Sequence, residues 1–209
     1  MRALVAAFLR DKNVVGAQGL EVTAERRLIV AICCCLPMLA HGRSAWRGWH
    51  DVVLYPGSFR VRRHEHDETE EVVTEWDDEL EGEAWSHGPI ILSWAAIEAD
   101  LADPLAGCNV VAHEIAHKLD LLDGVLDGTP PLPSSALESW REAMQPAFDA
   151  LVAAVQRNEE TSIDPYAAEG PDEFFAVVTE YYFSAPALLR EHMPAVHAVL
   201  RAYYRVEIG

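Results

Sequence analysis

The sequence predicts an α+β fold that is mainly helical, with a small sheet in the middle of the chain. Apolar residues recur at the three- and four-residue spacing of amphipathic helices over most of the chain, whereas strand-like runs are confined to residues 51–92. Half of the 209 residues are hydrophobic and 24% are charged, so the chain can bury a substantial core. We expect one domain over residues 1–209, with a helical part at 1–45 and a core at 46–209.

The first half of the chain is predicted to hold three helices and three strands. Residues 1–12 show an amphipathic helical pattern, and a second helix is expected to begin after Thr23, whose hydroxyl can cap it, and to end before Pro37. The other expected elements are strands at 51–55 and 58–62, an exposed hairpin or mobile loop over the acidic stretch 64–83, a strand at 89–92, and a short helix from Ser93 to Leu101.

The second half of the chain is predicted to hold four helices. Three of them begin at residue types that favour helix starts: an asparagine cap, a capping-box serine, and a proline in the first turn. The expected helices run from Asn109 to about Asp123 with Gly124 as the stop, from Ser135, in a capping box with Glu138, to about Asn158, from Pro171 to Phe183 after a loop at 159–170, and from about Ala187 to Val206.

The composition excludes some classes of partner and location. The chain has 34 acidic and 16 basic residues, and a surface with a net charge of −18 repels both nucleic-acid phosphates and anionic lipids. The apolar run from Leu28 to Ala40 is too short for a membrane span, which needs about 20 residues, and it lacks a signal-peptide cleavage site. Cys33, Cys34 and Cys35 are adjacent and are expected to be reduced, buried thiols. We therefore expect a cytoplasmic protein.

The segment His113-Glu114-Ile115-Ala116-His117 predicts a metal site on a helix. Residues four apart project from one helix face, about 40° apart, so the two imidazoles can converge on one zinc ion. Glu114 is turned about 100° from His113, and it can reach a water on the metal as a general base. The apolar flanks suit a buried helix, on which such residues are costly without partners. The alternative is a helix with surface histidines.

A catalytic zinc site needs a third protein ligand and keeps its fourth position for water. Asp123 lies six residues after the second histidine, where HExxHxxGxxH proteins place their last ligand, but Asp120 stands where that arrangement has its turn-forming glycine. Glu173 is the other candidate, since it shares one face of an otherwise apolar helix with Glu180. Asp120 and Glu180 suit hydrogen bonds to the imidazoles. Tyr166, in a loop, could stabilise an oxyanion.

At these residues the chain resembles the Mlc titration factor A family of bacterial zinc peptidases, whose catalytic fold is like that of anthrax lethal factor. The resemblance runs along most of the chain, and its most specific stretches are HEIAHKLD at 113–120, IDPYAA at 163–168 and PDEFFAVVTEYYFSAP at 171–186. It implies a catalytic core with zinc on His113, His117 and Glu173, with Glu114 as the base and Tyr166 as the transition-state stabiliser.

The same resemblance implies a function. It suggests a zinc-dependent metallopeptidase, of aminopeptidase type on short peptide substrates, that also binds an Mlc-like transcriptional repressor of sugar uptake. The competing hypothesis is a non-catalytic module that titrates a transcription factor and uses zinc mainly for structure. A purely structural site is disfavoured because only three protein ligands are evident, whereas structural zinc sites have four.

Overall fold

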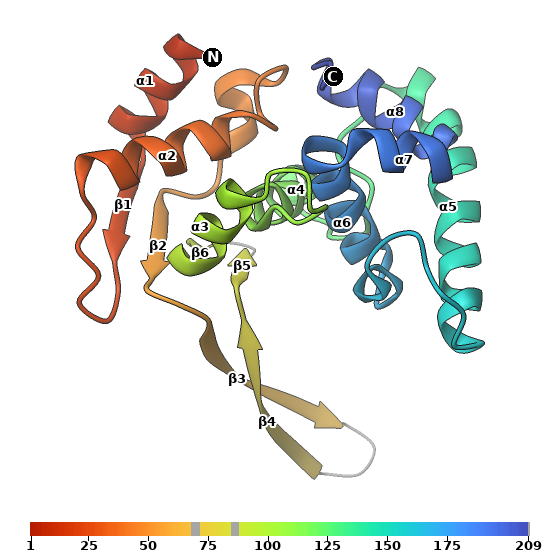
Figure 1. Cartoon of the computed structure of the whole chain (residues 1–209), viewed down its shortest axis with the longest axis horizontal. Coiled ribbons are helices and arrows are strands. Elements are labelled where there is room, and N and C mark those ends of the chain that lie inside the picture. Colours follow the sequence, from red (N-terminus) through yellow and green to blue (C-terminus); the bar gives the residue numbers. More distant parts are fainter. Residues whose placement is uncertain (68–71, 85–87, 209) are drawn as a thin grey trace.

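The computed structural model of the chain describes residues 1–67, 72–84 and 88–208, with the backbone alone for 60–67 and 72–79. The predicted α+β class is confirmed, because helices form most of the elements and a small mixed sheet lies among them (Figure 1). Helices α1 (Arg2–Asp11) and α8 (Pro194–Tyr204) lie on one side of the molecule, and a β-hairpin projects from the opposite side.

The main sheet has the strand order β1-β2-β6-β5. Strands β1 (Asn13–Gly16), β2 (Asp51–Tyr55) and β6 (Ile90–Ser93) are parallel, and β5 (Gly82–Ala84) runs antiparallel to β6 at the edge. The predicted strands at 51–55 and 89–92 are thus confirmed. Strand β1 is an addition to the prediction, because four residues are too few to show an alternating pattern, and its pairing with β2 means that residues 1–45 are not wholly helical.

The acidic stretch forms the projecting hairpin. Strands β3 (Phe59–Asp67) and β4 (Val72–Leu80) pair antiparallel, with Phe59 opposite Leu80 and Asp67 opposite Val72. The predicted hairpin is confirmed for the backbone, and its first strand extends well beyond the predicted end at residue 62. The predicted exposure of its side chains from 60 to 79 lies outside the described residues.

Most of the predicted helices are confirmed with their caps. Thr23 caps the helix that follows it through its hydroxyl, which accepts from the backbone N–H of Arg26 at 3.2 Å, and Ser93 caps the helix that follows it in the same way. No helix in the described part of the chain is long and apolar enough to cross a membrane. The other helices are α2 (Ala24–Cys35), α3 (Trp94–Ala102), α4 (Val110–Asp120), α5 (Ser134–Gln156), α6 (Pro171–Ser184) and α7 (Pro186–His192), with short 3-10 helices η1 (Gly42–Trp46), η2 (Leu121–Asp123) and η3 (Pro165–Ala168).

Two predicted helix boundaries are wrong. The capping box of Ser135 with Glu138 does not form, because α5 already begins at Ser134 and its first carbonyl acceptor is that of Pro133. The expected single helix at 187–206 is two helices, α7 and α8, and the break falls at Met193, directly before Pro194. Proline disfavours the helical conformation in the residue before it and has no N–H to continue the helix, so it starts a new helix instead.

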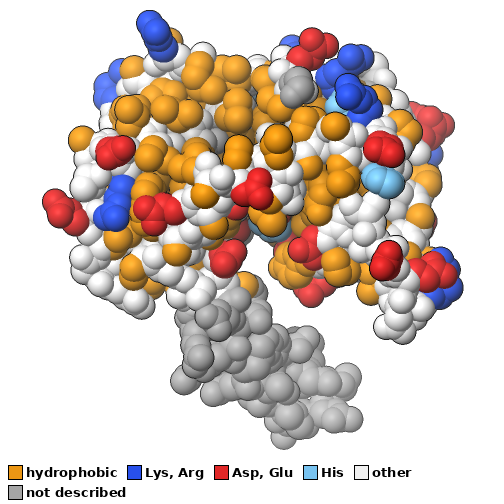
Figure 2. All heavy atoms as spheres, viewed as in Figure 1, with side chains coloured by type: hydrophobic (Ala, Val, Ile, Leu, Met, Phe, Trp, Pro, Cys, Tyr) orange, Lys and Arg blue, Asp and Glu red, His pale blue; other side chains and the backbone are white. Residues whose placement is uncertain are grey.

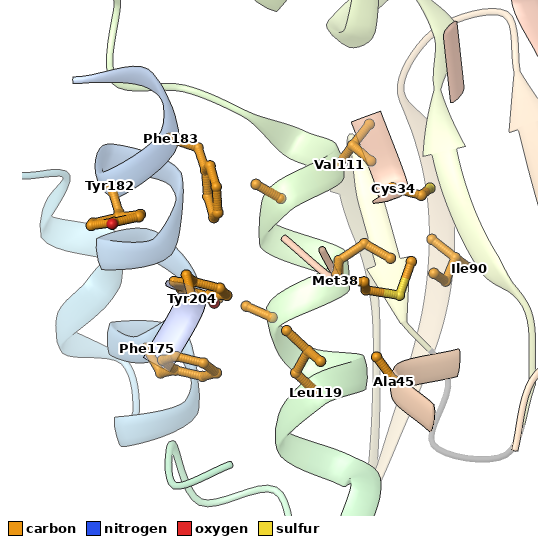
Figure 3. Close-up of a cluster of buried hydrophobic side chains, with 14 of the residues drawn as sticks. Cys34, Met38, Ala45, Ile90, Val111, Leu119, Phe175, Tyr182, Phe183 and Tyr204 are labelled. Atoms are coloured by element: carbon orange, nitrogen blue, oxygen red, sulfur yellow. The ribbon is translucent and has the colours of Figure 1, made fainter. Parts of the chain in front are cut away.

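Helix α4 lies between two groups of buried apolar side chains (Figure 3). On one side it meets residues of α2, the segment after α2 and the sheet, among them Cys34, Met38 and Ile90. On the other side it meets the aromatic residues of α6 and α8, among them Phe175 and Tyr204. This central position places any side chain that α4 directs toward the sheet edge in a partly enclosed space between β5 and α6.

Candidate metal and catalytic centre

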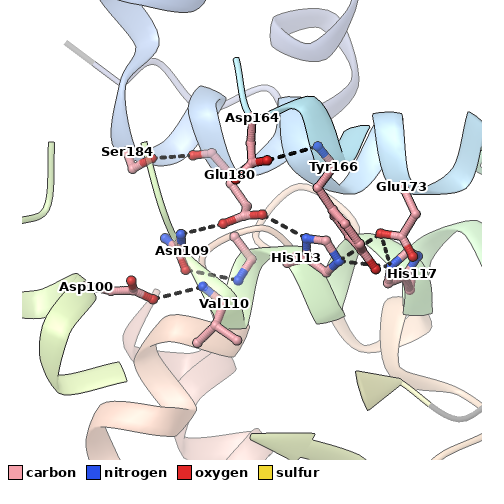
Figure 4. Close-up of polar contacts among 11 residues, drawn as sticks. Asp100, Asn109, Val110, His113, His117, Asp164, Tyr166, Glu173, Glu180 and Ser184 are labelled. Atoms are coloured by element: carbon pink, nitrogen blue, oxygen red, sulfur yellow. Dashed lines mark hydrogen bonds and ion pairs between the residues drawn. The ribbon is translucent and has the colours of Figure 1, made fainter. Parts of the chain in front are cut away.

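Helix α4 carries the two histidines and the glutamate of the predicted motif. It begins where Asn109 Oδ1 accepts a hydrogen bond from the backbone N–H of Ala112 at 3.0 Å, and the following η2 ends at Gly124, which has a left-handed φ of 95°. His113 and His117 are one turn apart, and their Nε2 atoms lie 3.1 Å from each other (Figure 4). Their side chains are only 14% and 10% exposed, so the alternative of a helix with surface histidines is wrong.

The structure brings Glu173 to the same point and leaves Asp123 elsewhere. Glu173, in the first turn of α6, places Oε2 3.2 Å from His113 Nε2 and 3.5 Å from His117 Nε2. In the described part of the chain, these three residues form the group whose donor atoms all lie within 4.8 Å of one another. Asp123 is exposed, and its Oδ1 accepts the backbone N–H of Val125 in a turn.

The three donor atoms have the spacing that a tetrahedral zinc site requires. Zinc binds nitrogen and oxygen at about 2.0–2.1 Å, so that neighbouring ligand atoms of a tetrahedron lie roughly 3.3–3.4 Å apart. The observed separations are 3.1, 3.2 and 3.5 Å. The Glu173 Oε2 atom is buried and has ion-pair contacts, but no partner of hydrogen-bond geometry among the described residues. A cation among the three atoms would satisfy this buried acceptor.

Glu180 lies on the same face of α6 as Glu173, about two turns further along, and contacts the other ring nitrogen of His113. Its Oε1 lies 2.7 Å from His113 Nδ1, and its Oε2 accepts the backbone N–H of Asn109 at 2.6 Å. An ionised carboxylate can only accept, so the imidazole proton resides on Nδ1 and the Nε2 lone pair is free for a metal. The expectation that Glu180 hydrogen-bonds an imidazole is confirmed.

The charges of this cluster are strongly coupled. Burial lowers the pKa of His113, but contacts with Glu173 and Glu180 outweigh burial and raise the pKa well above its usual value. Burial raises the pKa of Glu173, but contacts with the two histidines outweigh it and lower the pKa below its usual value. The two carboxylates therefore stabilise positive charge at His113, as they would stabilise a metal cation bound there.

Glu114 lies beside the cluster and is almost fully buried. Its side chain is 3% exposed, and its Oε2 has no hydrogen-bond partner among the described residues. Burial raises the pKa of Glu114 to about 7, although the two histidines act in the opposite direction. A carboxylate with a pKa near neutrality suits the role of a general base, as the spacing of the motif predicts.

Gly82 in the edge strand β5 makes room for Glu114, a contact that no sequence pattern predicted. A Cβ atom on Gly82 would lie 2.8 Å from Cδ and 2.9 Å from Cγ of Glu114. Such distances are too short for carbon atoms, so only glycine allows the strand to pass this close to the carboxylate. Strand β5 therefore passes directly over the carboxylate of Glu114.

Tyr166 lies in η3, on the open side of the cluster. Asp164 caps this short helix by accepting the backbone N–H of Tyr166 at 2.9 Å, which explains why the IDPY segment forms a fixed turn (Figure 4). The Tyr166 side chain is 41% exposed, and its ring centre is 6.3 Å from that of His113. Burial of the hydroxyl and the nearby Glu173 carboxylate raise the pKa of Tyr166 above its usual value, so the hydroxyl remains a donor.

Asp120 does not bind an imidazole, contrary to the prediction. Its carboxylate is fully buried, and Oδ2 accepts the backbone N–H of Gly128 at 2.7 Å. His117 Nδ1 has no hydrogen-bond partner among the described residues. The chain after α4 turns back through two left-handed glycines, Gly124 and Gly128, and this turn brings a backbone N–H to Asp120. Spacing on a helix alone cannot reveal such a turn.

A cavity of about 230 Å³ lies over the cluster. Its walls come from β5 and the end of β4, from α4, from the turn after α4, and from the starts of η3 and α6. Figure 2 shows acidic side chains on both sides of the hollow in the lower middle of the view. The described lining residues include carboxylates and histidines and no lysine or arginine, so the cavity favours cations.

Known proteins are similar in sequence to this chain over nearly its full length. The chain is 36% identical to Mlc titration factor A of Pectobacterium atrosepticum over 218 residues, which is 98% of this chain and 77% of that protein. It is 35% identical to Mlc titration factor A of Edwardsiella ictaluri over 216 residues, 97% of this chain and 78% of the relative. Residues 1–205 match the family described as Glucose-regulated metallo-peptidase M90. Because this match spans nearly the whole chain, the chain belongs to this metallopeptidase family.

Proposed function

We propose that the protein is a zinc-dependent metallopeptidase that would hold its metal through His113, His117 and Glu173. The observation that carries this proposal is the convergence of three donor atoms at 3.1 to 3.5 Å, with the buried carboxylate of Glu114 beside them. When bound, zinc would supply a water of lowered pKa and would polarise the scissile carbonyl.

Glu114 is the general base of the proposed reaction. Its carboxylate is unpaired on one oxygen and lines the cavity, so it can take a proton from the attacking water and later deliver it to the leaving amine. The low-polarity surroundings that raise its pKa to about 7 make both transfers possible near neutral pH. Gly82 keeps the strand from displacing this carboxylate.

Tyr166 is the donor that stabilises the transition state in this proposal. Its hydroxyl remains protonated, and its ring lines the cavity next to His113. Its hydroxyl interacts with the Glu173 carboxylate, so it lies beside the three donor atoms, where a substrate oxygen would be polarised. A donor placed where negative charge develops accelerates acyl transfer by about 10²–10³.

The edge strand β5 suits a peptide substrate. It pairs with β6 on one side, and in the described part of the chain no other strand pairs with its second side. An extended peptide can add to such an edge through backbone hydrogen bonds. Because Gly82 of β5 touches Glu114, a peptide on this edge would pass directly over the base.

The type of cleavage, the location and the protein partner that we propose come from the resemblance to the Mlc titration factor A family. Aminopeptidase-type cleavage of short peptides, a cytoplasmic location and binding of an Mlc-like repressor of sugar uptake are part of the proposal, and the name of the relatives, Mlc titration factor A, supports the last of these. That name also favours the second candidate, a module that binds the repressor and keeps zinc mainly for structure.

Replacement of Glu114 separates the two candidates. Glu114→Gln keeps the size of the side chain but removes the base, so we expect peptide hydrolysis to fall by at least 10²-fold while zinc content and repressor binding persist. Glu160→Gln makes the same chemical change at an exposed position and should behave as the parent does. Turnover in Glu114→Gln equal to that of the parent would eliminate the proposed mechanism, and repressor binding without any turnover in the parent would favour the binding module.

A further inference from the structure

We propose that Leu126 selects substrates with an apolar side chain next to the scissile bond. This inference rests on the proposed peptidase function and adds a specificity to it. Leu126 lines the cavity over the metal cluster, yet 43% of its surface remains exposed. A large apolar side chain that stays open to water inside a polar cavity is suited to contact with a ligand.

Among the described lining residues of the cavity, Leu126 is the most exposed apolar side chain. The described lining residues are mostly ionisable, with Glu83, Asp172 and the metal cluster around the space. The other aliphatic side chains among the described lining residues are Leu80, at the end of β4, and Ala84, at the end of β5. Leu126 comes from the turn after α4 rather than from the strand side.

The turn that carries Leu126 is held firmly. It lies between Gly124 and Gly128, which adopt left-handed φ values of 95° and 78°. The backbone N–H of Gly128 donates to the buried Asp120 at 2.7 Å, and its carbonyl accepts from Trp140 Nε1 at 3.3 Å. Leu126 is therefore presented by a fixed backbone, as selection by shape requires.

The same turn is attached to the helix that carries Glu173. A Cβ atom on Gly128 would lie 2.7 Å from the carbonyl carbon of Pro171, so the turn touches the first residue of α6. Glu173 follows two residues later. This contact fixes Leu126 relative to the three donor residues, because the turn packs against the start of α6 and Glu173 belongs to the first turn of α6.

The chemistry of the cavity gives the preference its direction. An apolar substrate side chain would cover the exposed part of Leu126 and release water, whereas an amide or carboxylate side chain would lose hydration there without a partner. A carboxylate would also meet the acidic lining. Discrimination by one apolar contact of this kind is typically tenfold or more.

Matched peptides and variants test the assignment. Two series of short peptides carry Leu or Asn, which are similar in size, either directly before or directly after the cleaved bond. For the zinc-loaded parent we expect kcat/KM for the Leu peptide to exceed that for the Asn peptide by at least about tenfold in one series. Leu126→Ala and Leu126→Asn should each bring this ratio close to 1, at unchanged zinc content. Val125→Ala is the matched control, because Val125 is 53% exposed in the same turn but does not line the cavity.

The outcomes separate this inference from the proposed function. If the parent cleaves peptides but shows no preference in either series, or if Leu126→Ala keeps the preference, the role of Leu126 is refuted. If the parent cleaves none of them, the peptidase function fails, and affinities of the same peptides for zinc-loaded Glu114→Gln and for Glu114→Gln with Leu126→Ala still decide the role of Leu126. Equal affinity of Leu and Asn peptides for the first of these proteins would overturn it.

Discussion

Gly82→Ala should damage catalysis far more than stability. The substitution adds one methyl group to β5, at the point where the strand passes over the carboxylate of Glu114. Alanine is no worse than glycine in a strand, so the backbone itself gives no reason for a loss. The expected effect comes entirely from the contact with the base.

The magnitude follows from the distances. The new Cβ atom would lie 2.8 and 2.9 Å from Cδ and Cγ of Glu114, whereas nonbonded carbons rest at about 3.5–4.0 Å. Relief of the clash needs a relative shift of roughly 0.6–1.2 Å. A misplacement of about 1 Å in a reacting group lowers the rate by about 10². Overpacking costs about 1–3 kcal/mol, which lowers Tm by roughly 2–4 °C per kcal/mol in a chain of this size.

The assay compares Gly82→Ala with Gly57→Ala. A Cβ atom on Gly57 meets nothing within 4 Å, and its backbone is not left-handed, so this control should match the parent. We expect kcat/KM for peptide hydrolysis to fall about 10²-fold in Gly82→Ala alone, with zinc content retained and melting lowered by a few degrees. A kcat/KM within about threefold of the parent would show that β5 does not fix the position of Glu114, well short of the expected loss.

Three further predictions concern the ligands, the oxyanion donor and the pH dependence of stability. Glu173→Ala should lose the metal and Asp123→Ala should retain it, as metal analysis after dialysis will show, and the reverse result would remove Glu173 from the site. Tyr166→Phe should lower kcat by about 10²–10³ with little change in KM or zinc, and a nearly unchanged kcat would mean that this ring serves packing only. Burial raises the pKa of Asp100 from 3.8 to about 6, although the hydrogen bond from the Val110 N–H acts in the opposite direction. Between these two pH values the folded state binds more protons than the unfolded state, so the free energy of unfolding falls as the pH rises through this window. Urea unfolding of metal-free Asp100→Asn should lack this contribution, and an identical pH dependence in both proteins would contradict it.

Local chemistry made much of the fold predictable. Thr23, Ser93 and Asn109 cap helices because their side-chain oxygens accept backbone N–H groups, and each does so in the structure. The same rules misplaced the start of α5, where two serines follow Pro133 and the backbone, rather than a side chain, supplies the cap. They also missed the break at Pro194, since an apolar pattern can continue across two consecutive helices.

The site was predictable only as far as side-chain periodicity reaches. Spacing of four on one helix brought the two histidines together, and spacing of seven identified Glu173 and Glu180 as a pair. The choice between Glu173 and Asp123 depends on how α6 packs on α4, which periodicity does not contain. Gly82 was beyond reach for the same reason, because a glycine in sequence shows backbone freedom but not the side chain that will lie against it.

Helix α4 is held in place by its contacts with the core. Ile115, Ala116 and Leu119 are fully buried, and they are interspersed along the helix with His113 and His117. In small zinc domains the ligands assemble only when metal binds, so that folding and metal uptake are one event. Here the donors stand on two helices that pack through buried apolar side chains, so a chelator should strip the ion without melting either helix. Loading would then proceed at the speed of entry through the cavity, and activity could follow the local supply of metal without any cycle of unfolding.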